Sequence, residues 1–583
     1  MKSNSVSVNS LNKTLSQKSL SPKAESRITL SESVYLLFFC VMLFAKAIGL
    51  YDGQPLYNII LVISAILFAA KLILTDYTWL ELLTVCALLL CSIITYLLSG
   101  ERGILMFVAV ITGIKGCSVR RLFKWSAALL GICFVVMAAL TQSGLVNDYY
   151  LVHNKGSLGY IVRWSFGYTH PNVMHITFII LIAFILYSLK LNLKRLRIAS
   201  MILMFANIYV FIYSVSYTGF ILATLYLVLN YLLEYRKSRL IMTAPYSNSE
   251  KDLQNSIIPV NESHEILWKV FDFLLQLVFP FCVFFSVAGP VLFKGKLFDL
   301  CDKLVHHRFV LSNYFLTNEK LSVLGHVLKT TPDANRSLDC SYVYLLVHCG
   351  VLPFLLICVA YIMLIRHCIV KRKYGELSII ITLVIAGVTE PFMFNASFKN
   401  ISALFIGEYL FELTEKAVEK SSIPIFLKKN FSLCKAGQHT LFFEKSSVLY
   451  NRITGNIHSA VRAFSRNNVR IIIYSAVAAV AITIIFSLTT VRPVSVLIPT
   501  ADCPDGYEST PAYYTEDEIN SADMNDVRIL SYSPDKEMVT FDGNTADLEY
   551  IRSLISCAVW SFAVSFIIII FVVRISERKR LHP

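Results

Sequence analysis

Several features of a soluble enzyme are missing from this sequence. Only 16% of its 583 residues are charged, while 56% are hydrophobic, and the mean hydropathy is +0.61. This composition excludes a soluble globular protein, in which about 25% of residues are charged. Apolar stretches of about 17 to 25 residues, long enough to cross a bilayer, recur from Ser33 to the end of the chain. The sequence therefore predicts an all-α polytopic integral membrane protein.

The sequence also lacks the local motifs of several enzyme classes. It contains no Walker A, HExxH, GxSxG or GxGxxG motif, which counts against an ATP-driven pump, a zinc protease and a serine hydrolase. The 14 cysteines include no C-x-x-C pair, and most lie in apolar stretches, where they act as small hydrophobic side chains. A secondary carrier stays open as an alternative, because carriers need no local motif.

About fourteen apolar stretches are predicted to be transmembrane helices. They lie near residues 34–50, 56–74, 79–98, 103–118, 123–142, 172–189, 198–215, 218–234, 268–292, 341–365, 376–393, 400–415, 470–490 and 551–573. Threading the chain through them puts every basic cluster on the same side as both termini, so the positive-inside rule makes the N and C termini cytoplasmic. Because the net charge of +14 is concentrated in these clusters, we expect membrane lipids and no nucleic acid as partners.

This topology divides the chain into four parts and leaves three segments outside the membrane. The parts are a disordered cytoplasmic tail (1–32), a main transmembrane domain (33–415) with outer loops 143–171 and 293–340, a basic cytoplasmic loop (416–469), and a two-helix module (470–583) whose extracytoplasmic segment 491–550 is acidic. The tail is rich in Ser, Asn and Lys and has no core-forming pattern. Because conspicuous polar residues gather in the outer loops, we look for function there.

The first outer loop ends in the segment Arg163-Trp-Ser-Phe-Gly-Tyr-Thr-His-Pro-Asn172, which immediately precedes an apolar helix. Proline fits the start of a helix, and Asn172 lies where the free N–H groups of a first turn favour an anion. Arg163 adds a permanent positive charge and planar donors that suit phosphate. Arg308 of the second outer loop is a second candidate phosphate ligand. For both arginines an alternative interpretation has equal weight, in which they lie at the membrane interface and contact lipid headgroups.

Two carboxylates stand near helix ends on the same predicted side. Glu390 lies near the outer end of its predicted helix, and a charged group at that depth is a functional-site hypothesis by default; the alternative is a water-exposed carboxylate. Asp339 comes just before a helix, where an acid is a common cap. His306 and His307 next to Arg308 lack an obvious third ligand, so we predict no metal site.

These segments together resemble the Wzy-type polysaccharide polymerases, integral-membrane glycosyltransferases of the O-antigen polymerase and ligase superfamily. The matching features, spread over residues 34–415, are Arg163 with Ser165-Phe-Gly-Tyr-Thr-His-Pro-Asn172, the Arg308 loop with Leu324-Gly325, Asp339-Cys-Ser-Tyr342, Thr389-Glu390-Pro391 and Gly113-Ile-Lys-Gly116. The chain departs from the family pattern in having His306-His307 instead of Ser-Gly before the loop arginine. It also has Ser216-Tyr-Thr-Gly219 where family members often have Ser-Arg-Thr-Gly.

The resemblance implies an enzyme that joins oligosaccharide repeat units carried on undecaprenyl pyrophosphate, at the outer face of the cell membrane. The product would be capsule, exopolysaccharide or O-antigen, and a flippase and chain-length regulators would be partners. No cofactor is implied. The implied roles are pyrophosphate binding by Arg163, Arg308 and Asn172, proton transfer by His170, Glu390 or Asp339, and sugar contact by Trp164, Tyr168 and Tyr342.

Two rival functions stay open. A ligase of the same superfamily would pass a finished glycan to another acceptor, and a non-enzyme flippase or secondary carrier would move lipid-linked glycans. A carrier predicts charged residues along a path through the membrane, whereas most predicted spans here have few charges. We therefore predict a metal-independent polymerase.

Overall fold

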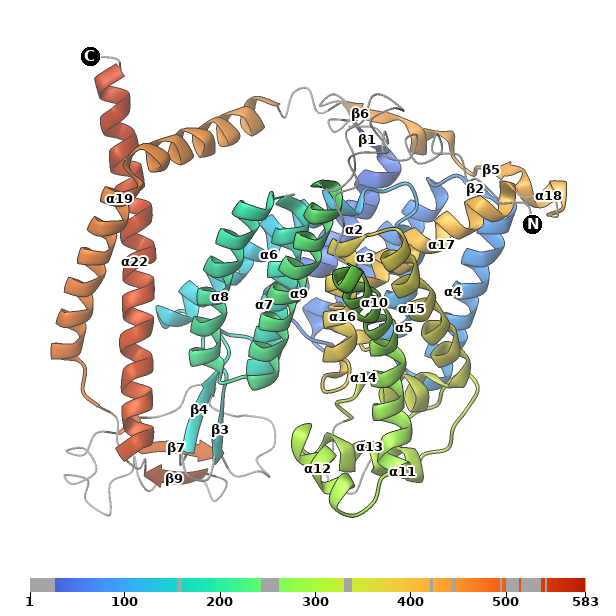
Figure 1. Cartoon of the computed structure of the whole chain (residues 1–583), viewed down its shortest axis with the longest axis horizontal. Helices are drawn as coiled ribbons and strands as arrows, with labels where there is room; N and C mark the ends of the chain where they lie inside the picture. Colours follow the sequence, from blue (N-terminus) through green and yellow to red (C-terminus); the bar gives the residue numbers. More distant parts are fainter. Residues whose placement is uncertain are drawn as a thin grey trace.

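The computed structural model describes eleven stretches of the chain, separated by gaps. They are residues 27–154, 160–189, 191–242, 262–329, 338–419, 423–442, 447–492, 495–499, 513–514, 536–540 and 543–581. Within them the helices run alternately between the two ends of one bundle (Figure 1). We call the end with strands β3 (Tyr150–Asn154) and β4 (Tyr160–Trp164) the hairpin end. The other end, with strands β1 (Arg27–Thr29), β2 (Tyr77–Thr78), β5 (Asn430–Phe431) and β6 (Thr440–Phe442), is the opposite end.

The first half of the bundle consists of helices connected by short turns, except between α6 and α7, where the β3–β4 hairpin lies. They are α2 (Leu30–Ala47), α3 (Pro55–Ile73), α4 (Trp79–Ser99), α5 (Arg102–Gly113), α6 (Val119–Gln142), α7 (Pro171–Leu189), α8 (Leu193–Ser214) and α9 (Tyr217–Met242). Local signals set several of the starts: Pro55 is the first residue of α3, and Thr78 forms a capping box with Glu81 before α4. Of the window of α7 that would span the membrane, 67% is buried, so α7 is a central helix.

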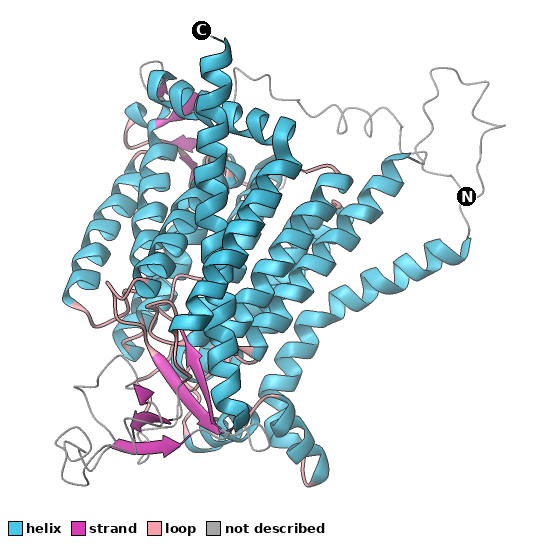
Figure 2. Cartoon of the chain, turned by 90° about the vertical axis from the view of Figure 1, so that its left-hand side faces the viewer, coloured by secondary structure: helices cyan, strands magenta, loops and turns pink. Residues whose placement is uncertain are grey.

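The second half contains more interrupted helices. They are α10 (Glu262–Val283), π-helical η2 (Phe284–Ala288), α11 (Gly289–Leu292), α12 (Lys296–Leu304), α13 (Arg308–Asn318), α14 (Ser341–Tyr344), π-helical η3 (Leu345–Cys349), α15 (Val351–Val370), α16 (Tyr374–Ala386), η4 (Pro391–Met393), α17 (Ser402–Glu419), α18 (Ile425–Lys428), η5 (Lys435–Gln438), α19 (Ser447–Thr489) and α22 (Gly543–Leu581). The long helices α19 and α22 pack side by side at the edge of the bundle (Figures 1 and 2).

Short antiparallel strands lie at both ends of the bundle. They are β1 (Arg27–Thr29) with β6 (Thr440–Phe442), β2 (Tyr77–Thr78) with β5 (Asn430–Phe431), the hairpin β3 (Tyr150–Asn154) with β4 (Tyr160–Trp164), and β7 (Ser495–Pro499) between β8 (Tyr513–Tyr514) and β9 (Lys536–Thr540). The segment predicted as a basic loop thus supplies β5 and β6. Figure 2 shows the strands of the hairpin end together below the helices.

The predicted class, a polytopic helical membrane protein, is confirmed. Among the described residues, 11 helices are long and apolar enough to cross a membrane. The predicted number of about fourteen spans is larger, for two reasons. Helices α5 and α16 are shorter than a full span, and α17 contains Glu408, Glu412 and Glu415.

Two predicted helices near the candidate residues have different bounds in the structure. The helix predicted over 341–365 breaks at Gly350, which has a φ of +99° and packs so closely on Gly325 that a Cβ would lie 2.3 Å from the Gly325 nitrogen. The helix predicted over 376–393 ends at Ala386. Glu390 therefore lies beyond the helix, in an extended conformation just before η4.

Two other predicted segments lie partly outside the described residues. Of the predicted tail, residues 1–26 are outside, while residues 27–32 form β1 and the first turn of α2. Most of the acidic segment 491–550 is also outside. Its described parts are residues 491–492, β7, β8, β9 and the start of α22.

Candidate functional site at the hairpin end

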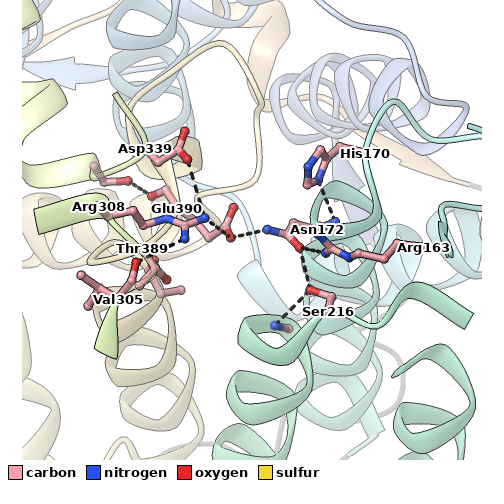
Figure 3. Close-up of polar contacts among 12 residues, drawn as sticks. Arg163, His170, Asn172, Ser216, Val305, Arg308, Asp339, Thr389 and Glu390 are labelled. Carbon is pink, nitrogen blue, oxygen red and sulfur yellow. Dashed lines mark hydrogen bonds and ion pairs between the residues drawn. The ribbon is translucent and has the colours of Figure 1, made fainter. Parts of the chain in front are cut away.

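Candidate residues from separate segments meet in one polar network at the hairpin end (Figure 3). Arg163 comes from β4, Asn172 from the first turn of α7, and Arg308 from the start of α13. Asp339 precedes α14, and Glu390 follows α16. The structure thus brings together five residues that sequence reasoning had to consider one by one.

Asn172 is the bridge at the centre of this network. Its Oδ1 accepts hydrogen bonds from Arg163 Nη2 at 2.7 Å and from the Ser216 hydroxyl at 2.9 Å. Its Nδ2 donates to Glu390 Oε1 at 3.0 Å. Because the arginine can only donate, these contacts fix which way the amide points. Asn172 thereby links an arginine on one side to a carboxylate on the other.

Arg163 is buried at the edge of the β3–β4 hairpin, with 9% of its surface exposed. Besides Asn172, its guanidinium donates from Nε to the Ser214 carbonyl at 3.1 Å. Burial lowers the pKa of Arg163 to about 10, partly offset by the nearby Glu390 carboxylate. The side chain remains cationic at neutral pH and is held in one position.

Arg308 is paired more loosely than Arg163. Its Nη2 lies 3.6 Å from Asp339 Oδ2 and 3.8 Å from Glu390 Oε1, which are distances of an ion pair without a short hydrogen bond. Its Nη1 donates to the Val305 carbonyl at 3.4 Å, whereas its buried Nε has no hydrogen-bond partner among the described residues. A buried guanidinium with unsatisfied donor capacity can accept an anionic ligand without first breaking a tight contact.

Glu390 lies between the two arginines, with 8% of its surface exposed. Its backbone carbonyl accepts a hydrogen bond of 2.5 Å from the Ser341 hydroxyl, which fixes the extended segment after α16. Burial raises the pKa of Glu390 to about 7, and Asp339 adds to this rise, whereas Arg308 and Lys399 oppose it. A carboxyl group with such a pKa can exchange a proton near neutral pH.

The His170 side chain contacts the backbone of the first turn of α7. Its Nδ1 accepts a hydrogen bond of 3.0 Å from the backbone N–H of Asn172, so Nδ1 is unprotonated and the neutral ring has its proton on Nε2. In this arrangement the ring can donate a proton, but its accepting nitrogen is already engaged. Glu390 therefore has a better geometry for accepting a proton than His170.

The three aromatic residues predicted to contact sugar are packed inside the protein. Tyr168 and Tyr342 are 0% and 1% exposed, and their hydroxyl groups donate to the carbonyls of Ala47 and Val384. Trp164 points to the other face of β4 from Arg163, where its ring lies under the Arg552 guanidinium of α22 at 4.9 Å. None of the three offers a free ring face to a sugar in this conformation.

Asp148 is a positioning residue that sequence reasoning missed. Its Oδ1 accepts from Gly167 N at 2.8 Å and its Oδ2 from the Tyr213 hydroxyl at 2.6 Å. These bonds hold a tight turn in which Phe166 has a φ of +51° and Gly167 a φ of +77°. The signal was available in the sequence, because Asp148 is the only acid in residues 143–171.

Ser216 and Lys399 are two further members of the site without a predicted role. In the sequence, Ser216 stands out only because Tyr217 follows it where the family pattern often has an arginine. In the structure, its hydroxyl donates a hydrogen bond to Asn172. Lys399 Nζ donates to the Val173 carbonyl in the first turn of α7 at 3.0 Å. Burial, and then the neighbouring Lys46 ammonium, lower the pKa of Lys399 to about 7. The available signal was that Lys399 is the only charged residue between Glu390 and Glu408 in the sequence.

His306 and His307 lie at the turn before α13. His307 Nδ1 lies 2.7 Å from Asp302 Oδ2 at the turn between α12 and α13, and both His306 and His307 have positive φ. Across the residues that the structure describes, no group of three or more His, Cys, Asp or Glu side chains is arranged to hold a metal ion.

Comparison with known proteins gives no relative: no family model, no curated protein and no solved structure matches this chain. What the fold and site define is a multi-pass helical membrane protein with a buried network of arginines, carboxylates and an asparagine at one end. Any more specific function has to be argued from this network.

Proposed function

We propose that this protein is a glycosyltransferase that polymerises undecaprenyl-pyrophosphate-linked oligosaccharide repeat units at the outer face of the cell membrane. The observation on which the proposal rests is the network that joins Arg163, Asn172, Glu390 and Arg308 at the hairpin end. The positive-inside rule supports an outer location, because the basic segments between helices lie at the opposite end.

The arginines suit the departure of a pyrophosphate. When the bond between the anomeric carbon and the pyrophosphate oxygen breaks, the electron pair leaves with the lipid pyrophosphate and negative charge develops there. Fixed guanidinium groups stabilise such a charge, and they do so best where water is excluded. Arg163 is held in place by Asn172 and by the Ser214 carbonyl, whereas Arg308 keeps an unsatisfied buried donor.

Glu390 suits the other half of the reaction. The acceptor hydroxyl must lose its proton as its oxygen forms the new bond to the anomeric carbon, and a carboxylate within reach can take that proton. The buried Glu390 has a raised pKa of about 7, which matches this task. We therefore place Glu390 ahead of His170 and Asp339 as the base, and assign Asp339 to the orientation of Arg308.

The test is a gel analysis of lipid-linked glycans from a strain that lacks this protein, complemented with variants. We expect Arg163→Ala and Arg308→Ala to abolish polymer, with single lipid-linked repeats accumulating, while both proteins remain in the membrane. Arg102→Ala is the matched control, because Arg102 is an arginine at the same end that pairs with Asp52 on the surface. It should make normal polymer.

The same gel separates the alternatives. Accumulation of full-length lipid-linked polymer would replace the polymerase by a ligase. Repeats trapped on the cytoplasmic face would replace it by a flippase or carrier. Normal polymer from both arginine variants would overturn the assignment of the network as a glycosyltransferase site.

A further inference from the structure

The start of α22 packs against the hairpin end of the bundle, beside β4 and the last turns of α8 (Figure 1). Only 6% of the window of α22 that would span the membrane is buried. Glu549, near the start of this helix, is nevertheless 6% exposed. Helix α22 therefore has little buried surface, and part of that surface lies next to the candidate site.

Glu549 and Arg552 form an ion pair within one turn of this helix. Arg552 donates to Glu549 Oε2 from Nη2 at 2.9 Å and from Nε at 3.1 Å. The two side chains are 14% and 6% exposed. Several hydrogen bonds between a guanidinium and a carboxylate restrict their relative orientation, so the Arg552 guanidinium is held in place.

This ion pair contacts two aromatic rings of the bundle. The Arg552 guanidinium carbon lies 4.9 Å from the centre of the Trp164 ring and 5.4 Å from that of Tyr213. Trp164 Nε1 also donates to Glu549 Oε2 at 3.4 Å. A guanidinium is attracted to the face of an aromatic ring, and the attraction is stronger where water is excluded. We call these four residues the α22 clamp.

Each ring of the α22 clamp is the direct neighbour of one partner in a contact of the site. Trp164 follows Arg163 on β4, and Tyr213 precedes Ser214, whose carbonyl accepts a hydrogen bond of 3.1 Å from Arg163 Nε. Successive side chains on a strand point to opposite faces, so α22 contacts β4 from the face away from Arg163. The clamp thus holds both backbone segments that determine the position of the Arg163 guanidinium.

We propose that Glu549 and Arg552 are positioning residues, which set the place of the Arg163 guanidinium through the two aromatic rings of the α22 clamp. This inference rests on the proposed function, in which Arg163 stabilises the departing pyrophosphate. A displacement of about 1 Å at a reacting centre can cost a large part of the rate. Because the charge develops only in the transition state, such a loss lowers kcat more than it raises KM. The two-helix module is then part of the catalytic unit.

The test removes the ion pair as a unit. Replacing Arg552 alone would take this partner from a buried carboxylate, so the double variant Glu549→Gln/Arg552→Met is used. In polymerisation by the purified full-length protein, we expect kcat to fall about tenfold and KM to change by less than about twofold. Arg492→Met is the matched control, because Arg492 is an exposed arginine of the same module that pairs with the exposed Asp547.

The control should have unchanged kcat. A loss in Arg492→Met as large as that in the double variant would overturn the proposal. So would a double variant that raises KM and leaves kcat unchanged.

A double-mutant cycle separates positioning from a merely structural contact. Arg163→Lys retains the positive charge, so a residual rate can be measured. If the α22 clamp acts through Arg163, its loss should change kcat by less than about twofold in this background, because residues that act through one another are not additive. Equal losses in the wild-type and Arg163→Lys backgrounds would mean that the clamp acts elsewhere and would overturn the proposal.

Hydrogen exchange tests the α22 clamp without an assay of polymer. Peptides that cover β4 and the end of α8 should exchange at least about threefold faster in the double variant than in Arg492→Met. If exchange and kcat are both unchanged while Arg163→Ala makes no polymer, the clamp is wrong and the polymerase stands. If exchange rises while Arg163→Ala and Arg308→Ala make normal polymer, the polymerase is wrong, and the positioning role fails with it.

Discussion

Both ends of the bundle contain buried charged side chains, but these side chains are paired differently at the two ends. At the opposite end, Lys115 pairs directly with Glu81 and Arg121 with Glu32. The fully buried Lys71 donates to the Ser31 hydroxyl at 2.7 Å and to the Lys115 carbonyl at 2.8 Å. These contacts tie α2, α3, α4, α5 and α6 together, so the charges at this end serve the fold.

At the hairpin end the pairing is incomplete. Arg308 stays 3.6 and 3.8 Å from its two carboxylates, and Arg163 reaches Glu390 only through Asn172. A buried arginine held at ion-pair distances can bind an anion without first losing a short hydrogen bond to a carboxylate.

The largest effect expected from this comparison is a contrast between Arg121→Ala and Arg308→Ala. Losing Arg121 leaves Glu32 without its partner, which should destabilise the protein by about 3 to 5 kcal/mol. Losing Arg308 should change stability by less than about 1 kcal/mol, because Glu390, with a pKa of about 7, is easily protonated. Unfolding of the purified proteins, followed by intrinsic fluorescence, measures both. Equal destabilisation would remove the distinction between the two ends.

The second prediction concerns Glu390 and pH. Since only the carboxylate form accepts a proton and burial raises the pKa to about 7, polymerisation should be slow below pH 7 and rise through it. Glu390→Gln should lower the rate about 100-fold or more. Polymerisation by purified protein, measured as kcat/KM between about pH 5 and 9, tests this.

Glu101→Gln provides the control for this profile. The Glu101 side chain is as buried as that of Glu390, with 11% exposed in both cases, and it also lies at the hairpin end. It pairs with Tyr344 outside the network. We expect this variant to retain the rise through pH 7. A rise centred on pH 4 to 5 in the wild type would exclude Glu390 as the base.

The smallest expected effect belongs to Ser216→Ala. This change removes one of the two hydrogen bonds to Asn172 Oδ1 and leaves the other, from Arg163, in place. One such bond contributes about 1 kcal/mol, so we expect about a fivefold loss of kcat/KM. Ser143→Ala is the control, because Ser143 is an exposed serine at the same end whose hydroxyl donates to the Leu140 carbonyl, and it should have unchanged activity. A larger loss in Ser143→Ala than in Ser216→Ala would contradict the network.

Much of the helical architecture could be predicted from the sequence. The start of α7 at Pro171 and the end of α6 at Gln142 agree closely with the predicted 172–189 and 123–142. The prediction was less accurate where the backbone is interrupted, at Gly350 and after Ala386. Those breaks depend on packing between segments far apart in the chain, such as Gly325 against Gly350.

The candidate site could be predicted as a set of residues but not as a geometry. Arg163, Asn172, Arg308 and Glu390 were identified from residue type and position, and Asp339 through the family resemblance. The structure places all five together. The orientation of each side chain could not be inferred, which is why Trp164 was predicted to meet sugar although it packs against α22. Asp148 and Lys399 were given no role, because a single charge marks a candidate position but gives no information on its partners.

The sequence by itself determined that this is a membrane protein and where most of its helices lie, because a bilayer selects for apolar stretches of a given length. It also determined which rare polar residues stand at helix ends. Only the tertiary structure decided which buried charges are paired by short contacts and which, like Arg308, are paired at longer distances. That distinction depends on distances between side chains from separate helices, and no local pattern in the chain encodes them.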